Sequence, residues 1–375
     1  MAGIYVHIPF CRKKCFYCDF YKTTAIADKQ PFLQALKRET ETQAAYLAGE
    51  TVETIYLGGG TPSVLEIDEL AALLGLFRNQ FPVSPGAEIT LEANPDDLTP
   101  EYLLHLRAAG FNRLSIGIQS FDDAALKKMN RRHTARQAFE SVEMAAAAGF
   151  CQISIDLIFG LPGQTTAQWE DNLHQALQLP ANHLSAYHLT YHEGTPFYNW
   201  LKKGTLHELD EEESLRQFEI LTDLTARAGF EQYEISNFAR AGAYSKHNTG
   251  YWTGKKYLGL GPSAHSYNGS SRRWNIASLK QYLEKINRDE CCFEQEILTE
   301  KEQLNDYLIT SIRTKWGISR QFVQTRFGAA MLKTVCDSVK NYEKTGHVKT
   351  ENDRILLTHQ GIMISDEIMV ALMVV

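Results

Sequence analysis

Short apolar runs alternate with longer amphipathic stretches through the first two-thirds of this 375-residue chain, and this alternation limits the possible folds more than any other feature. Strands are predicted at residues 4–8, up to 57, and at 88–93, 112–120, 151–162 and 183–190. Helices are predicted at residues 30–48, 67–80, 100–109, 135–148, 166–179 and 211–228. About six strand–helix units of this kind predict an α/β fold with a parallel sheet and crossover helices.

Polar residues and glycines follow the ends of most of these strands, which bears on whether the sheet curves into a barrel. They are residues 58–61 (GGGT), Glu92, Gln119, Asp156 and Thr190. Barrels draw their working residues from the carboxyl ends of several strands, whereas an open doubly wound sheet concentrates its ligand at one switch point. Six units are too few for a closed eight-stranded barrel, so we predict a partial (β/α)6 barrel with an open side.

The composition and the residue patterns of the sequence change after about residue 274. Glycines thin out, charge rises and helical patterns dominate, so a boundary is predicted between residues 270 and 295, and we divide the chain into residues 1–275 and 276–375. The second unit is predicted to be a small, mostly helical domain with a hairpin in GHVKTENDRILLT. Its apolar tail, IMVALMVV at residues 368–375, is interpreted as a final helix or strand packed on that domain; peripheral membrane contact is the alternative.

Charge and cysteine content narrow the class of protein. A formal net charge of −7 argues against binding nucleic acid through a general basic field. We find no secretory signal and no apolar run of the roughly 18 residues that a membrane-spanning helix needs. Seven cysteines, an odd number at uneven spacing, do not resemble a disulfide framework. These features predict a cytoplasmic protein in reducing surroundings, where clustered cysteines bind metal or do redox chemistry.

Three of the cysteines, Cys11, Cys15 and Cys18, lie within eight residues in CRKKCFYC. A structural zinc site needs four ligands, of which His7 or a distant residue would supply the fourth. A packing role suits the run poorly, because the charged residues at 12–14 and 19 are typical of an exposed loop. Iron–sulfur clusters use cysteine thiolates, normally four per [4Fe–4S] cluster. Three thiolates would leave one iron open for a small molecule.

The spacing C-x3-C-x2-C after the first strand, followed by GGGTP after the second, resembles the radical S-adenosylmethionine superfamily. Further stretches over nearly the whole chain extend the likeness: YVHIPFC, LEANP, LSIGIQSF, NRRHT, IDLIFGLPGQT and HNTGYW. Together they resemble the group that contains the anaerobic coproporphyrinogen dehydrogenases (HemN) and the haem chaperones (HemW), with the haem chaperones the closer match.

The resemblance implies a [4Fe–4S] cluster held by Cys11, Cys15 and Cys18, with the amino and carboxylate groups of S-adenosylmethionine on the open iron. It also implies that haem is a cargo, which the protein passes to an acceptor such as a respiratory, membrane-associated haem protein. The fold that it implies is the partial barrel followed by a small HemN-like C-terminal domain.

The resemblance assigns roles to single residues as well. Tyr5 resembles the tyrosine that contacts the cluster-bound S-adenosylmethionine, and Tyr17 is placed to lie against its adenine. For both tyrosines, core packing is the alternative. In HemN relatives the positions that resemble Gln119, Arg131 and Asp156 help to hold a second S-adenosylmethionine.

The glycine loop and the next strand end supply four more candidates. Gly59 and Gly60 let the backbone approach a ligand closely, because no Cβ intervenes, and Thr61 shapes the turn. Glu92 corresponds to an acid that contacts the ligand near its ribose or amino group. The alternatives are an ordinary glycine turn and an acid that caps the next helix.

Two histidines are candidate haem ligands, because histidine is a common axial ligand of haem iron. His247, in KHNTGYW, is the leading candidate, and His265, in GPSAHSY, is the second. Taken alone, His247 beside Tyr251 and Trp252 is more readily a loop histidine with two core aromatics. The resemblance to the HNxxYW motif of the haem chaperones reverses that preference.

Two departures from HemN separate the hypotheses for function. Phe20 stands where HemN has a fourth cysteine, and the chain reaches Cys11 without the longer N-terminal arm of HemN. The first hypothesis is therefore a haem chaperone, and the second is an oxygen-independent coproporphyrinogen dehydrogenase. A radical enzyme that acts on another substrate, such as a methyltransferase, is the third. Whether the chain is an enzyme stays open at this point.

Overall fold

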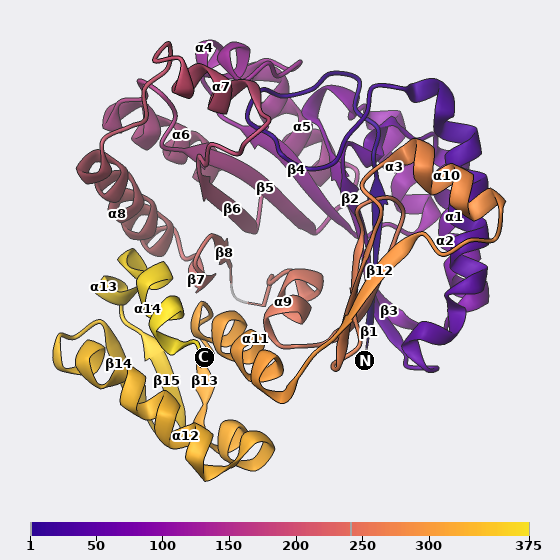
Figure 1. Ribbon diagram of the computed structural model, residues 1–375. Helices are drawn as coiled ribbons and strands as arrows, with labels where there is room; N and C mark the ends of the chain where they lie inside the picture. The colour runs from indigo at the N-terminus through magenta and orange to yellow at the C-terminus, as the bar shows by residue number, and fades with distance from the viewer. Residues whose placement is uncertain (1, 241, 375) are drawn as a thin grey trace.

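The computed structural model describes residues 2–240 and 242–374, and its centre is a curved twelve-stranded sheet (Figure 1). Six strands run parallel in chain order: β1 (Ala2–Ile8), β2 (Val52–Gly59), β3 (Val83–Ala93), β4 (Arg113–Gln119), β5 (Gln152–Phe159) and β6 (His183–His188). The six predicted strands correspond to these six, so the predicted parallel sheet is confirmed. Because the strands are parallel and adjacent, their carboxyl ends meet at one rim.

Helices connect the parallel strands, and most of them cover the outer face of the sheet (Figure 1). They are α1 (Lys29–Thr42), α2 (Ile67–Gln80), α3 (Pro100–Ala109), α4 (Asp123–Lys128), α5 (Ala135–Ala147), α6 (Thr166–Gln178), α7 (Pro196–Lys202) and α8 (Glu211–Arg227). Local sequence signals determine where several of these helices begin and end. Thr99 caps α3, Pro100 is its first residue, and Gly110 ends it in the left-handed conformation.

The main hydrophobic core lies between the parallel strands and these helices. Ile4, Val6 and Ile8 of β1 are fully buried, together with Leu36 of α1 and Phe77 of α2. A strand covered on both faces has a nearly continuous apolar sequence, and β1 has this property. The packing therefore fixes β1 in the middle of the sheet, with its carboxyl end at the rim.

Further strands extend the sheet at both edges. β8 (Asn237–Ala239) and β7 (Glu231–Glu234) follow β6 in antiparallel pairings. At the other edge β9 (Lys256–Leu260) runs parallel to β1 and leads to the antiparallel strands β10 (His265–Tyr267), β11 (Ser271–Asn275) and β12 (Phe293–Ile297). The helix α9 (Lys246–Trp252) lies inside the curve, and α10 (Leu279–Asn287) packs on α1 (Figure 1). Within the described residues the edge strands β12 and β7 do not pair with each other. The sheet is therefore a partial barrel with an open side, as predicted.

The end of the chain forms a smaller unit with its own hydrophobic cluster. Its helices are α11 (Glu300–Ile312), α12 (Arg320–Lys344), α13 (His359–Met363) and α14 (Ser365–Leu372), and its strands are β13 (Ile318–Ser319), β14 (Val348–Glu351) and β15 (Arg354–Leu357). The β14–β15 hairpin is the one predicted in GHVKTENDRILLT. The apolar tail forms α14, with Ile368 and Leu372 buried in the second cluster, and residue 375 lies outside the described residues.

The packing favours a boundary later than residue 275. α10 contributes Leu279, Tyr282 and Ile286 to the main core, and β12 pairs with β11, whereas the second cluster begins at Leu304. We therefore propose that the two units meet just after β12, near residue 298.

Three ion pairs between described residues join the units across the open side of the barrel, one of them between Lys315 and Glu231 of β7 at 2.7 Å. Arg313, which follows α11, approaches Glu234 of β7 to 2.6 Å. Arg272 of β11 pairs with Asp306 of α11. In the part of the chain that the structure describes, no helix has the length and apolar character that a bilayer span requires.

Candidate cluster pocket and aromatic cavity

The three clustered cysteines lie on the loop that follows β1, at the rim of the barrel. Cys11 is buried, and its sulfur accepts a hydrogen bond from the Thr61 hydroxyl at 3.3 Å. The Cys15 sulfur accepts one from Arg131 at 3.5 Å. All three thiols are free of disulfides. Side chains from two later loops therefore hold the cysteine loop over the strand ends.

A pocket of about 430 Å³, here called the cluster pocket, opens beside these cysteines. Most of the predicted site residues line it: Cys11, Cys15, Tyr17, Cys18, Gly59, Gly60, Thr61, Glu92, Gln119, Arg131 and Asp156. They come from loops and strand ends that are far apart in the sequence. The structure brings them together because parallel strands place their carboxyl ends at the same rim.

Steric contacts explain the glycine loop after β2. A Cβ atom on Gly60 would lie 2.8 Å from the carbonyl oxygens of Ile8 and Phe10. Those carbonyls accept the N–H groups of residues 60 and 61, each at 2.8 Å. Gly59 has a φ of +103°, and a Cβ atom there would lie 2.6 Å from the His7 ring. Only glycine allows this backbone contact with the segment that leads into the first cysteine.

Glu92, at the end of β3, is held in the cluster pocket by two donors. The Tyr56 hydroxyl donates at 2.8 Å and the Gly59 N–H group at 3.0 Å. Burial raises the pKa of Glu92 to about 7, against the opposing effect of the Tyr56 hydrogen bond, and the nearby Asp156 charge adds to the increase. A carboxyl group with a pKa near neutrality can accept a hydrogen bond from the amino or hydroxyl groups of a ligand.

Asp156, inside β5 and three residues before that strand ends at Phe159, is a second acid in the same pocket. Burial raises its pKa to about 6, and the Ser115 hydroxyl donates to both of its oxygens at 3.4 Å. Gln119, at the end of β4, has a φ of +68°, which is unusual for a residue with a side chain. Such a backbone conformation is common where a side chain must be aimed at a ligand.

Arg131 extends into the cluster pocket from the loop after α4. One terminal nitrogen donates to the Asn94 side chain at 2.7 Å and another reaches the Cys15 sulfur. Its Nε is buried and has no partner among the described residues. The guanidinium therefore supports the cysteine loop and leaves one donor directed at no protein atom.

The donor set fits an iron–sulfur cluster. Burial raises the pKa values of the Cys11 and Cys18 thiols, and iron offsets this effect when it binds the thiolates. Within the described residues, no three His, Cys, Asp or Glu side chains converge on one point as ligands of a single ion. The thiolates of a cluster bind different irons, so they have no need to converge.

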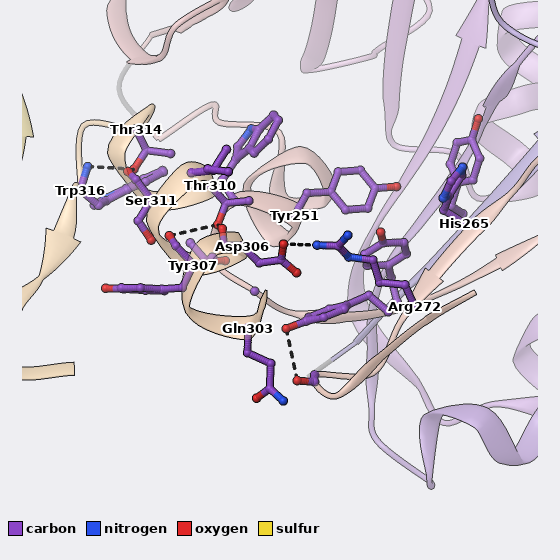
Figure 2. A pocket seen from close by; sticks show the side chains of 18 of the residues that line it. Tyr251, His265, Arg272, Gln303, Asp306, Tyr307, Thr310, Ser311, Thr314 and Trp316 are labelled. Carbon is purple, nitrogen blue, oxygen red and sulfur yellow. Dashed lines mark hydrogen bonds and ion pairs between the residues drawn. The ribbon is translucent and has the colours of Figure 1, made fainter. Parts of the chain in front are cut away.

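A larger cavity of about 1150 Å³, here called the aromatic cavity, lies between the open side of the barrel and the C-terminal unit (Figure 2). Aromatic side chains from both units line it, among them Tyr251, Tyr257, Tyr267, Tyr307, Trp316 and Phe322. Figure 2 shows the Arg272–Asp306 pair inside this space, joining β11 to α11. A wall rich in aromatic rings, with polar and charged groups between them, suits a large, flat, partly polar ligand.

Asp19 and Phe20 line both the cluster pocket and the aromatic cavity. The Phe20 side chain is 66% exposed, which is unusual for so large an apolar group. Lys22 steadies this turn by donating to the Phe20 carbonyl at 3.1 Å. The residue that replaces the fourth cysteine of HemN is therefore an exposed ring at the border of the two spaces.

The two predicted haem ligands lie in different surroundings. His247 is 4% exposed, and both ring nitrogens are bonded, Nδ1 to the Thr54 hydroxyl and Nε2 to the Tyr251 hydroxyl, each at 2.8 Å. Burial lowers the pKa of His247 to about 3, which keeps the ring neutral. His265 lines the aromatic cavity, and its ring forms no hydrogen bond with a described residue. An iron atom could reach His265 directly, whereas binding to His247 would first require one of its two hydrogen bonds to break.

Tyr5 lines the aromatic cavity and is not among the residues that line the cluster pocket. Its ring stacks on those of Tyr56, at 6.2 Å, and His247, at 6.4 Å, and its hydroxyl bonds to His7 Nδ1 at 3.1 Å. The predicted contact of Tyr5 with S-adenosylmethionine stays a prediction.

Several residues of these sites lay outside the sequence predictions. Tyr56 holds Glu92, and Asn94 anchors Arg131. Asn94 stands in the LEANP motif, so its polarity beside Glu92 was an available signal. The Arg313 guanidinium lies 4.3 Å from the centre of the Trp252 ring, and no local pattern indicates this contact between units.

A partial parallel barrel with three cysteines and a glycine loop at its rim defines a protein of the radical S-adenosylmethionine class. In agreement, residues 5–176 match the family described as the Radical SAM superfamily, and residues 298–364 match the HemN C-terminal domain. The structure is also similar to that of coproporphyrinogen III oxidase (HemN) from Escherichia coli, with a TM-score of 0.86 and 25% sequence identity, covering 99% of this chain and 90% of that one.

Curated relatives narrow the assignment. The chain is 37% identical over 374 residues to the heme chaperone HemW of Bacillus subtilis, covering 98% of both chains. It is 34% identical to that of Lactococcus lactis, covering 97% of this chain and 95% of the relative. It is 32% identical to a bovine mitochondrial protein named radical S-adenosyl methionine domain-containing protein 1, covering 99% of this chain and 87% of that protein. The chain therefore belongs to the HemW family, whose superfamily implies a [4Fe–4S] cluster and S-adenosylmethionine.

Proposed function

We propose that this chain is a haem chaperone that binds a [4Fe–4S] cluster, S-adenosylmethionine and haem, and delivers the haem to an acceptor protein. The observation that carries the proposal is the aromatic cavity, which shares Asp19 and Phe20 with the cluster pocket. The names of the Bacillus and Lactococcus relatives support it. A cytoplasmic location, with peripheral contact to a membrane-associated acceptor, is part of the proposal.

On the cluster side, Cys11, Cys15 and Cys18 would hold the iron–sulfur cluster. When bound, the cluster supplies an open iron for S-adenosylmethionine and an electron for its sulfonium. The chain's own groups orient that ligand. Glu92 and Asp156 accept hydrogen bonds from its polar groups, Tyr17 packs against adenine, and the loop at residues 59–61 brings backbone close to it. The roles of Gln119 and Arg131 at a second S-adenosylmethionine belong to the same proposal.

On the haem side, aromatic rings offer flat surfaces for the porphyrin, and His265 is an available imidazole on the wall. Arg326 and Arg354 also line the cavity, and a guanidinium pairs well with the carboxylate of a propionate. Arg272 is less available, because Asp306 already pairs with it.

Haem titration of the cluster-loaded protein tests this function. We expect a saturable Soret band at one haem per chain. Thr310 lines the cavity, so Thr310→Trp should fill part of the space and lower the haem affinity, and His265→Ala should lower it as well. His174→Ala, on the exposed face of α6, is the matched control and should behave as wild type. A weak, non-saturating response of the wild type would refute the proposal, as would failure to pass haem to an apo-form haem protein.

The likeness to HemN favours coproporphyrinogen dehydrogenase as the second candidate. Phe20, in the place of the fourth cysteine, argues against it. Anaerobic incubation with reductant, S-adenosylmethionine and coproporphyrinogen separates the two functions. Formation of protoporphyrinogen at a rate comparable to that of a HemN control would favour the second candidate.

A further inference from the structure

The helix α9 places His247 and Tyr251 on one face, four residues apart. The Tyr251 hydroxyl and His247 Nε2 form a 2.8 Å hydrogen bond, and His247 Nδ1 continues the chain to the Thr54 hydroxyl, also at 2.8 Å. Glu88 fixes the start of the helix by accepting the His247 backbone N–H group at 3.0 Å. Of this hydrogen-bonded series, Tyr251 is the member that borders the aromatic cavity.

The hydroxyl groups of two other tyrosines in the cavity wall bond to backbone groups. Tyr267 donates to the Gly269 carbonyl at 3.4 Å, and Tyr307 accepts the Ser319 N–H group at 2.8 Å. The Tyr251 hydroxyl instead forms its hydrogen bond with an imidazole nitrogen of His247. A histidine hydrogen bond stabilises a phenolate, and tyrosine phenolate is a known axial ligand of haem iron.

We propose that Tyr251, rather than His247, is the residue of the KHNTGYW segment that binds haem iron, and that His247 is a positioning residue for its phenol. This inference rests on the proposed function, because it takes the aromatic cavity to be the haem site. It accounts for a buried histidine whose two nitrogens are already bonded.

The coordination step involves no change of oxidation state. The phenol O–H bond of Tyr251 breaks, an Fe–O bond forms to ferric haem, one water leaves the iron, and the proton passes to water. His247 stays neutral, donates a hydrogen bond from Nε2–H to the phenolate and accepts a hydrogen bond from the Thr54 hydroxyl at Nδ1. A neutral imidazole can hold either tautomer, so the arrangement needs no buried imidazolium.

His265 lines the same cavity and would be a candidate for a second ligand. In Figure 2 the hydroxyl end of Tyr251 is directed toward the side of the cavity that carries His265 and Arg272. His265 belongs to β10 of the sheet edge and Tyr251 to α9, so the two side chains approach the cavity from different elements.

Tyr5 and His7 form a second tyrosine–histidine pair at the cavity, with a longer bond of 3.1 Å. The Tyr5 ring is stacked between neighbouring rings, and His7 Nε2 bonds to the Tyr21 carbonyl at 2.8 Å. The shorter bond and the position on α9 favour Tyr251, and substitution of Tyr5 provides a direct comparison.

Resonance Raman spectroscopy of the cluster-loaded chain with one equivalent of ferric haem tests the inference. The wild type should give phenolate–iron modes. Tyr251→Phe, which keeps the ring, should lose these modes and release haem at least tenfold faster to an excess of apomyoglobin. His247→Gln keeps the Tyr251 hydroxyl, so its modes should persist at shifted frequencies, with haem release a few-fold faster. Tyr198→Phe, on α7 and outside the cavity, is the matched control.

The outcomes separate this inference from the proposed function. Stoichiometric haem binding without phenolate modes in the wild type overturns the inference alone. The inference is also overturned if Tyr251→Phe keeps the wild-type spectrum, if Tyr5→Phe is the variant that loses it, or if His247→Gln alone loses an imidazole ligand. Absence of stoichiometric haem binding in the wild type overturns the proposed function and this inference together. If Tyr251→Phe fails to fold, the wild-type and His247→Gln spectra still decide.

Discussion

The backbone N–H group of Gly59 donates a 3.0 Å hydrogen bond to the Glu92 carboxylate, which fastens the glycine loop after β2 to the end of β3. The bond joins two residues that are 33 positions apart in the sequence. It also places a buried acid beside the loop that approaches the cluster cysteines. The pKa of Glu92 and the packing of the glycine loop both have measurable effects on stability.

Glu92 should make stability fall as the pH rises. Its carboxyl ionises near 4.5 in the unfolded chain and near 7 in the folded one, so the folded state binds more protons between these values. Unfolding free energy therefore decreases through that window and levels off above it, by about 3 kcal/mol at most. Urea unfolding of the cluster-free protein at pH 5 and pH 8 measures the change. Glu92→Gln should have a shallower pH dependence, and equal slopes in the two proteins would contradict the prediction.

Gly60→Ala should damage the rim of the barrel. The added Cβ would lie 2.8 Å from two backbone carbonyl oxygens, which cannot move as a flexible side chain could. We expect a loss of about 2 kcal/mol or more in unfolding free energy and lower iron retention. Gly75→Ala is the control, because no atom lies within 4 Å of its Cβ position in α2. That variant should gain up to about 1 kcal/mol from helix propensity.

Substitution of Cys11, Cys15 or Cys18 by serine should in each case remove most of the bound iron and acid-labile sulfide. A hydroxyl is a poor ligand for the irons of a cluster, and no other described cysteine lines the cluster pocket. Iron and sulfide analysis after anaerobic reconstitution gives the readout. Cys151→Ser, at an exposed thiol, should retain the wild-type content. A full iron complement in any of the three variants would show that its thiol is not a ligand.

Arg313→Met should weaken the connection between the two units. Glu234 is 2% exposed, and loss of the 2.6 Å ion pair would leave its carboxylate buried with only neutral donors. We expect a loss of about 3 kcal/mol in unfolding free energy, measured by urea denaturation at pH 7. Arg136→Ala removes an exposed pair with Glu140 and should leave stability unchanged. Equal midpoints for the two variants would be the contrary result.

Local sequence signals predicted the parallel part of the fold closely. α2 and α3 occupy residues 67–80 and 100–109, the ranges predicted from the alternation of apolar runs and amphipathic stretches. The edge strands β7 to β12 were not predicted. Each has three to five residues, too few for a periodic pattern, and each owes its extended form to a neighbouring strand.

The cluster pocket was predictable for a related reason. Polar residues near the carboxyl ends of parallel strands must gather at one rim, so Glu92, Gln119 and Asp156 could be grouped from the sequence. Tyr56 was missed because it lies within a strand and looks like a core residue. Its hydroxyl finds Glu92 only when β2 and β3 are side by side.

The sequence by itself determined the order of strands and helices, the three-cysteine loop and the family, because these depend on neighbouring residues and on motif spacing. Only the tertiary structure decided which side chains face which space. From the sequence, His247 of KHNTGYW was the leading candidate haem ligand, and Tyr251 was only a neighbouring aromatic residue. Folding buries the histidine between Thr54 and Tyr251 and leaves the tyrosine at the cavity. The aromatic cavity likewise exists only where the C-terminal unit meets the open barrel, a contact between segments that no local pattern records.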